Sequence, residues 1–350
     1  MAFTNRVATV TNIKLIPKVV DTVLNSNILF KRIVSQPKSW SGERMRFPIK
    51  YQNGVSGQSF SGFDTFSTAA SERRINMEYF VKGYQKTVSL PLMEVDANNT
   101  DEQTLSLVAN ELTLAAQEMA DEVGNIFYAD GTGNGGKDFL GLGAIVDDGS
   151  VAPTIGGLSR TTYATLNSTV TASGGALSLT NMRTLYNNIV SGGQRPTLGV
   201  TTEAIHGFYE RLLQQFLRIN VTAQSADPSA AYKVGNGGSP SRGQASFSGL
   251  DYMGFPIVMD EKCTSGVLFF LNENFIEWRA LKSKMGKDVP YSPGDVEGND
   301  YNSIKDFGFS WTDWIKPINQ YAIIGHLIME GELLTTNPKR HGKLTGITGI

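Results

Sequence analysis

Apolar residues recur at helical spacing through 100–129, the most regular pattern in the chain. The positions, three or four apart, are Leu105, Val108, Leu112, Ala115, Met119, Val123 and Ile126. This spacing places them on one face and predicts a long amphipathic helix. Thr100 and Gln103 form a capping box at its expected start, and the glycine-rich DGTGNGG ends it.

Strand-like alternation dominates 44–92 instead. RMRFPIKYQ forms one leg, and INMEYFVKGYQKTVSLPL forms a second in which Ile75, Met77, Tyr79 and Val81 alternate with other side chains. A Gly/Ser/Thr-rich stretch separates the legs. The pattern predicts one long β-hairpin with a flexible middle.

Three aromatic residues, Phe60, Phe63 and Phe66, lie in the middle of this predicted hairpin. A hairpin has no obvious way to bury aromatic rings at its own tip. Two interpretations follow: the tip folds back on its own domain, or it projects and docks on a neighbouring subunit.

The amino-terminal stretch 1–43 has the character of an arm. This stretch contains six basic and two acidic residues, and its apolar residues recur at roughly helical spacing after Pro17. The segment is too small to hold a core of its own, so it must pack against something else.

Helix-like and strand-like signals alternate through 151–320, which fits an α/β or α+β domain. Helices are expected at Thr180–Val190 and Glu203–Leu217, and strands at 197–202, 253–260 and 266–281. The segment 321–338 is expected to form long strands near the carboxy terminus.

Composition limits the class of protein. The chain has 350 residues, enough for two domains, and 40% of them are hydrophobic, which excludes wholesale disorder. Only 18% are charged, so much of the surface is neutral and polar, as suits extended β-structure or surface covered by other subunits. A net charge of -2 gives no reason to expect a nucleic-acid binder.

Acidic residues are concentrated between Met93 and Asp130, where nine acids occur without a lysine or arginine. Glu111, Glu118, Asp121 and Glu122 lie on the predicted long helix. The ordinary explanation is a solvated face. The alternative is a face that repels a polyanion.

No motif predicts catalysis, a cofactor or a metal. GTGNGG at 131–136 matches the dinucleotide fingerprint in its glycines, but a helix precedes it where a strand is needed. As a calcium loop beginning at Asp130, it has Gly141 where the bidentate glutamate belongs. The glycines are therefore expected to end the helix and turn the chain.

The remaining reactive side chains are isolated in the sequence. Cys263, the single cysteine, excludes a disulfide framework and a cysteine-rich zinc site, and it is expected to be an inert thiol in a turn between strands. His206, His326 and His341 have no second ligand at helical spacing, so each is expected to be structural. No secretory signal or membrane-spanning segment is predicted, which indicates a reducing, cytosol-like compartment.

The order of these features resembles a tailed-bacteriophage major capsid protein of the Hong Kong 97-type fold. A basic arm, a long hairpin and a long amphipathic helix leaving through ADGTGNGGKDFLGLG are followed by a mixed domain containing YMGFPIVMDEKCTSGVLFFLNENFIEWRAL. The resemblance implies an α+β fold divided into five parts. These are an arm at 1–43, an extended loop at 44–92, a peripheral domain at 93–150, an axial domain at 151–320 and carboxy-terminal strands at 321–350 that complete the sheets.

The resemblance also implies a function. Copies of the chain would form hexamers and pentamers of an icosahedral shell around double-stranded DNA, in a virion assembled in the host cytoplasm, without enzymatic activity or a cofactor. The extended loop would carry Phe60, Phe63 and Phe66 onto the adjacent subunit, and the acidic helix face would line the inside and keep the genome from sticking.

The same resemblance implies partners for the chain, and the chain also differs from its relatives in two respects. A portal is implied, and because the chain begins almost directly at the arm, so is a separate scaffolding protein or prior processing. Some relatives cross-link subunits through a Lys and an Asn, but no feature here identifies a partner for the hairpin lysines at 82 and 86. Three alternatives stay open: an encapsulin-like compartment, a soluble α+β enzyme with dispersed site residues, and a β-rich surface or tail protein.

Overall fold

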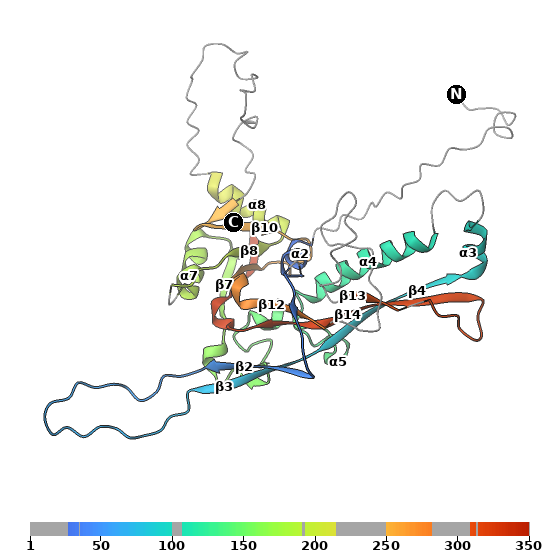
Figure 1. Ribbon diagram of the computed structural model, residues 1–350. Coiled ribbons are helices and arrows are strands. Elements are labelled where there is room, and N and C mark those ends of the chain that lie inside the picture. Colours follow the sequence, from blue (N-terminus) through green and yellow to red (C-terminus); the bar gives the residue numbers. More distant parts are fainter. Residues whose placement is uncertain are drawn as a thin grey trace, which may run out of the picture.

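The computed structural model describes residues 27–34, 36–99, 107–190, 193–214, 250–281, 309–312 and 314–349. Two large sheets form the body, and a long two-stranded hairpin projects from it (Figure 1). The mixed sheets and helices confirm the predicted α+β class. No helix in the described ranges is both long and apolar enough to span a membrane.

The first sheet is built around one long strand, β14. Its five strands are β1 (Lys38–Ser39), β4 (Lys82–Pro91), β12 (Ile276–Ala280), β13 (Phe309–Trp311) and β14 (Ala322–Thr335). β14 pairs with β4 along its first ten residues and with β12 along its last five. The carboxy-terminal segment thus supplies the central strand of a sheet whose other strands come from both halves of the chain.

The second sheet has six strands and two covering helices. The strands, in spatial order, are β7 (Thr169–Ala176), β15 (Gly342–Gly349), β11 (Leu268–Leu271), β8 (Leu198–Thr201), β10 (Phe255–Met259) and β9 (Leu250–Tyr252). The helices are α7 (Leu179–Ile189) and α8 (Glu203–Gln214). Both predicted helices are confirmed within the described residues. Ser178 caps α7 by accepting a hydrogen bond from Asn181 N–H at 3.1 Å.

The predicted single strand at 266–281 is wrong, because two strands of different sheets share it. β11 belongs to the second sheet and β12 to the first. Between them Asn272 caps a short 3₁₀ helix, η3 (Glu273–Phe275), and donates from Nδ2 to the carbonyl of Arg195 at 2.7 Å. This buried side chain fixes the bend that carries the chain from one sheet to the other.

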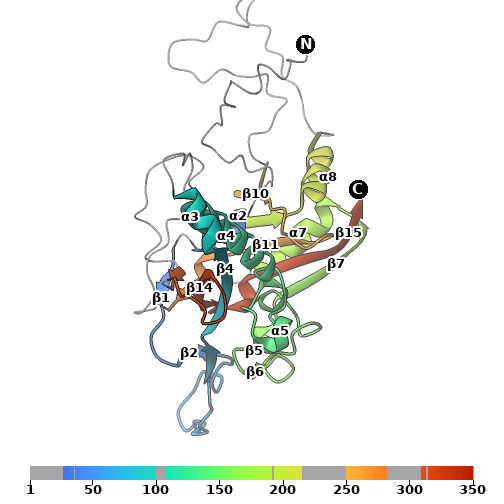
Figure 2. The same cartoon turned by 90° about the vertical axis from the view of Figure 1, so that its right-hand side faces the viewer.

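The predicted long helix is confirmed as α4 (Leu107–Ile126), which lies along the first sheet (Figure 2). Its predicted apolar stripe faces the core, with Ala115, Met119 and Val123 fully or nearly buried. The helix ends at Ile126, three residues before the expected end at 129. The predicted capping box of Thr100 and Gln103 lies outside the described residues.

Helix α2 (Ile28–Val34) is the described part of the predicted arm, and it packs on α4. Asn27 donates from Nδ2 to the carbonyl of Ala120 at 3.1 Å, directly over Gly124. A Cβ at Gly124 would lie 1.6 Å from Asn27 Nδ2, so glycine leaves the notch that this side chain occupies.

The predicted hairpin at 44–92 is shorter than expected. β2 (Arg44–Lys50) pairs with β3 (Arg74–Phe80), but the chain then changes sheets at Val81 and continues as β4 beside β14. Lys82 and Lys86, expected in the hairpin, therefore lie in the first sheet. The strand pattern runs unbroken through this point, so alternation alone contained no sign of the change of partner.

Short elements complete the described chain. Helix α3 (Leu92–Asn98), which the sequence analysis did not predict, follows β4 directly. The others are α5 (Gly133–Gly136), α6 (Leu142–Ile145), β5 (Thr154–Ile155), β6 (Leu158–Ser159), η1 (Ala164–Leu166) and η5 (Pro338–Arg340).

Candidate functional site

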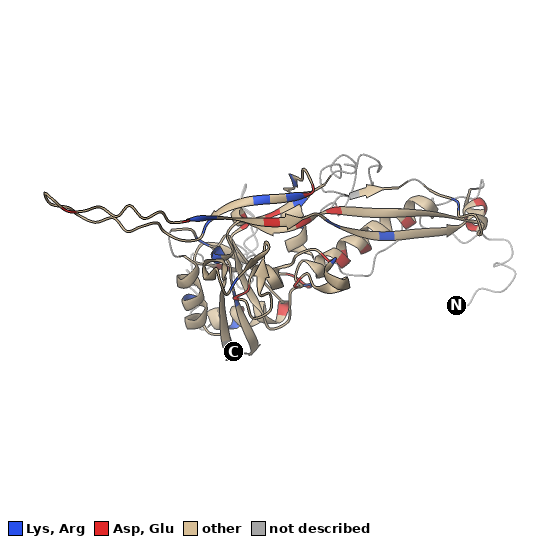
Figure 3. Cartoon of the chain, turned by 90° about the horizontal axis from the view of Figure 1, so that it is seen from below, with Lys and Arg blue, Asp and Glu red and all other residues tan. Residues whose placement is uncertain are grey.

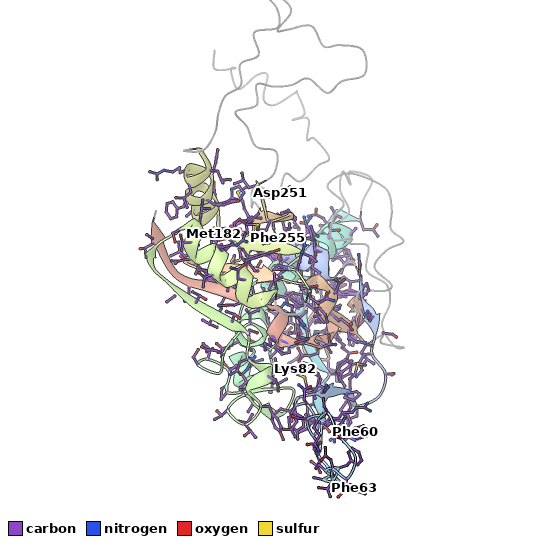
Figure 4. All side chains as sticks on the ribbon, turned by 90° about the vertical axis from the view of Figure 1, so that its left-hand side faces the viewer. Phe60, Phe63, Lys82, Met182, Asp251 and Phe255 are labelled. Atoms are coloured by element: carbon purple, nitrogen blue, oxygen red, sulfur yellow. The ribbon has the colours of Figure 1, made fainter. Side chains whose placement is uncertain are left out.

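The tip of the hairpin projects away from the body with its phenylalanines in water. Phe60, Phe63 and Phe66 are 66%, 104% and 62% exposed. Figure 4 shows Phe60 and Phe63 at the far end of the hairpin, away from both sheets. The rings of Phe60 and Phe66 meet edge to face at 5.2 Å and cover each other only in part. The tip does not fold back on the described body, and a group of exposed aromatic rings is typical of an interaction surface.

The base of the hairpin is anchored firmly. Met77 is fully buried, the ring of Phe47 meets Tyr79 edge to face, and the guanidinium of Arg279 lies over the Phe47 ring, 5.5 Å from its centre. Tyr79 Oη donates a hydrogen bond to the carbonyl of Thr335 at 3.0 Å. A rigid base under an exposed tip holds the aromatic rings at a defined distance from the body.

Lys82 and Glu332 hold the point where the hairpin leaves the first sheet. Lys82 Nζ lies 3.5 Å from Glu332 Oε2, and it also donates to the carbonyl of Asp138. Glu332 is almost fully buried and accepts a hydrogen bond from Leu140 N–H at 2.6 Å. Burial raises the pKa of Glu332 to about 7, because removal from water disfavours its charged form. One carboxylate thus joins strands β4 and β14 to the loop after α4.

The acidic residues of α4 are largely neutralised within the chain. Lys86 lies 3.0 Å from Glu118 and 2.6 Å from Glu122, and Lys262 lies 2.8 Å from Asp121. Glu111 has no cationic partner among the described residues. Figure 3 shows basic residues of the neighbouring strands close to the acidic helix. The sequence analysis missed this pairing, because both lysines are distant in the chain.

The glycine-rich turn after α4 has the structural role expected of it. Asn134 and Gly135 adopt left-handed conformations, with φ of 50° and 69°. A Cβ on Gly141 would lie 2.3 Å from the carbonyl oxygen of Ala129, so the chain turns back tightly against the helix end. The Asp130 carboxylate accepts hydrogen bonds from Thr132 N–H and Oγ1–H, which lower its pKa.

The histidines and the cysteine occupy separate environments. His341 is fully buried, accepts a hydrogen bond at Nδ1 from Asn272 N–H, and has its pKa lowered to about 3 by burial. His326 Nδ1 lies 3.0 Å from Thr87 Oγ1 at a strand surface. Cys263 is buried in the turn between β10 and β11, where burial raises the pKa of its thiol. The described residues contain no group of three potential metal ligands from His, Cys, Asp and Glu.

A cleft of about 550 Å³ lies between α2 and β12. Its walls carry two ion pairs: Arg32 with Glu273 at 2.8 Å and Lys38 with Glu277 at 2.6 Å. Each carboxylate is already paired with a cation, Arg32 from α2 and Lys38 from the strand β1 beside β12. This arrangement is typical of a structural contact between helix and sheet.

Comparison with known proteins shows similarity in fold without close similarity in sequence. No family profile matches the chain, and no curated protein matches it either. A chain of the cyanophage A-1(L) capsid asymmetric unit superposes with a TM-score of 0.73 at 14% identity, over 99% of this chain and 100% of that one. The capsid of a native GTA particle gives 0.62 at 10% identity, over 99% and 100%.

One similar structure has a different description. The holo-SrpI encapsulin complex from Synechococcus elongatus superposes with a TM-score of 0.58 at 11% identity, over 99% of this chain and 96% of that one. The similarity to all three covers 99% of this chain. The chain therefore has the Hong Kong 97-type fold shared by capsid proteins of tailed phages.

Proposed function

We propose that this chain is a major capsid protein, copies of which form the hexamers and pentamers of an icosahedral shell around double-stranded DNA. The main support is the projecting hairpin, which carries three exposed phenylalanines on an anchored base. The full-length similarity to the cyanophage A-1(L) capsid chain supports the same proposal.

In this proposal the hairpin tip lies across an adjacent subunit. Burying a Phe side chain contributes roughly 1.5–3 kcal/mol, so three of them supply a substantial part of a subunit contact. Phe60, Phe63 and Phe66 are the residues of this contact. Each copy would place its hairpin tip on one neighbour and receive the tip of another neighbour, so these contacts would link the copies around a ring.

We assign the parts of the chain accordingly. The arm is 1–43, the extended loop is 44–92, the peripheral domain with its spine helix is 93–150, the axial domain is 151–320, and 321–350 completes the sheets. The pairing of β14 with β4 supports the last assignment, because it joins the end of the chain to the strand that leads into the peripheral domain.

The acidic face of α4 is proposed to line the interior of the shell, with less negative charge than the sequence suggested. Lys86 and Lys262 neutralise much of the charge of Glu118, Asp121 and Glu122, which leaves Glu111 as the acid without a described cation. A weakly negative lining would still disfavour adhesion of a packaged genome. A portal and a scaffolding protein are the further partners of such a shell, which would be assembled in the host cytoplasm and found in the virion.

Expression of the full chain, alone and with a candidate scaffold, tests the proposal. Closed shells or hexameric and pentameric rings in negative-stain images, with matching mass by light scattering, are expected. A chain that stays monomeric or dimeric at high concentration, with scaffold and crowding agents, would overturn it.

An encapsulin-like compartment is the second candidate, supported by the similarity to the holo-SrpI complex. The contents of purified particles distinguish the two. Nuclease-protected DNA supports a genome container, and a co-purifying enzyme without DNA supports a compartment.

A further inference from the structure

Three basic residues at the neck of the hairpin have no acidic partner among the described residues. They are Lys50, Arg73 and Arg74, all exposed, and we call them the hairpin neck. The cations nearer the base differ, since Arg44 and Arg46 lie 3.4 Å and 2.8 Å from Glu78. With the exposed Glu72 beside Arg73 counted, the neck still has an excess of two positive charges on the projecting part of the molecule.

Two of these cations face each other across the hairpin. Lys50 pairs with Arg74 in the β2–β3 register, so their side chains leave the same face at directly opposite positions. Like charges in this position destabilise a strand pair. An isolated hairpin gains nothing from this arrangement, whereas a negative partner surface would be bound by both charges.

The opposite end of the molecule carries such a surface. Glu94 and Asp96 are exposed on α3 and pair with no cation in the described part of the chain; we call them the α3 acids. Tyr321 Oη donates to Asp96 at 2.9 Å and holds that carboxylate in place. Figure 1 shows α3 and the hairpin at opposite ends of the body.

We propose that the hairpin neck of one copy docks against the α3 acids of a second copy. This inference rests on the proposed assembly of copies and names the charges that set its register. Because the two surfaces lie at opposite ends of one chain, the contact is head-to-tail, the kind of contact that builds a ring when the rotation between copies closes. Complementary charge of this kind speeds association and disfavours wrong registers.

Charge reversal on each surface tests the pairing. We expect K50E/R74E and E94K/D96K each to slow assembly at least about tenfold at about 0.05 M NaCl, with a smaller difference at about 0.5 M. The two variants mixed should assemble together, because each reversed surface then meets a complementary one. K339E is the matched control, since Lys339 is exposed on η5 and belongs to neither surface, and it should behave as the unaltered chain.

The single variant K50E separates docking from folding. It places a glutamate opposite Arg74, so the hairpin of the isolated chain should be as stable as before or more stable, while assembly slows. Circular dichroism and thermal unfolding measure the first effect, and light scattering the second. If Lys50 had only a structural role, K50E would not keep or raise the stability of the hairpin while it slowed assembly.

The possible outcomes separate this inference from the proposed function. Reversed variants that assemble normally, or a mixture no better than its components, overturn the pairing while the shell proposal stands. Normal shells that lose only their DNA would mean that the neck binds nucleic acid instead, which also overturns it. If the unaltered chain forms no shells, sedimentation of the mixed variants still measures the pairing, and absence of a complex overturns it.

Discussion

Leu29 N–H donates a hydrogen bond to Asp260 Oδ2 at 2.9 Å, although the two residues lie 231 positions apart in the chain. Asp260 is fully buried and also accepts a hydrogen bond from Lys262 N–H at 3.0 Å. Its carboxylate therefore fixes the start of α2 to the turn between β10 and β11. Through this contact, the described end of the arm is held on the body and not merely tethered to it.

Replacing Asp260 should loosen α2 before anything else. D260A leaves two backbone N–H groups without their acceptor, so we expect a loss of roughly 2–3 kcal/mol in the free energy of unfolding. D260N keeps one side-chain oxygen and should lose less. Urea unfolding measures the total, and hydrogen exchange of 28–34 shows whether α2 opens locally. Equal exchange in D260A and the unaltered chain would contradict the role of this contact.

Glu332 should make stability fall as pH rises through weakly acidic values. Burial raises its pKa to about 7, against an ordinary glutamate value of about 4.5, so between these values the folded chain holds a proton that the unfolded chain has lost. The loss should be on the order of 3 kcal/mol from pH 4.5 to 7. E332Q should remove this slope in urea unfolding measured across the range.

His341 provides the opposite sign as an internal control. Burial lowers its pKa to about 3, so the unfolded chain binds a proton below about pH 6.5 that the folded chain refuses. The stability that the neutral His341 side chain contributes to the fold is therefore lost as pH falls from 6.5 towards 3. Because the two contributions oppose each other between about pH 4.5 and 6.5, H341Q should leave the decline due to Glu332 uncompensated, whereas E332Q should leave a stability that rises with pH. Identical pH profiles for both variants would contradict these assignments.

The tip phenylalanines should matter to assembly and not to the isolated fold. F60S/F63S/F66S removes apolar surface that is already in water, so the unfolding free energy should change by no more than about 0.5 kcal/mol. Shell formation by light scattering should be abolished or strongly reduced. M77A, at the buried base, is the contrasting variant and should cost about 2–5 kcal/mol. Normal shells from the triple variant would remove the hairpin tip from the contact.

Gly141 should tolerate no side chain. A Cβ there would meet the carbonyl oxygens of Ala129 and Ile126 at 2.3 Å and 2.5 Å, and backbone atoms at a helix end have little room to move. G141A should therefore lose roughly 1–3 kcal/mol or more. G57A is the matched control, because nothing lies within 4 Å of a Cβ at that exposed position. Thermal unfolding of the two variants compares them directly.

Local pattern was sufficient for much of the fold. The apolar stripe of α4, the helices α7 and α8 and the turn at Cys263 all depend on neighbours within a few residues, and the sequence predicted each of them. The exposed tip was also foreseeable in part, since three phenylalanines in a glycine-rich stretch had no local partner. The assignment of these rings to a subunit contact remains a proposal.

Strand partners could not be predicted, because alternation records which faces are buried and not which strand lies alongside. The second leg of the expected hairpin therefore concealed the change of sheet at Val81, and 266–281 concealed a second change at Asn272. The reduced charge of α4 was hidden for a related reason. Lys86 and Lys262 reach its acids from other strands and turns, at distances in sequence that no helical spacing describes.

The sequence by itself determined the long helix, the helices α7 and α8 and the order of the main segments, since these follow from short-range periodicity, and it left open whether the hairpin tip folds back or projects. Only the tertiary structure decided which charges remain without partners. Ion pairing depends on the few ångströms between side chains from distant strands. The excess positive charge of the hairpin neck and the α3 acids without a cationic partner follow only from the arrangement of the described side chains in space.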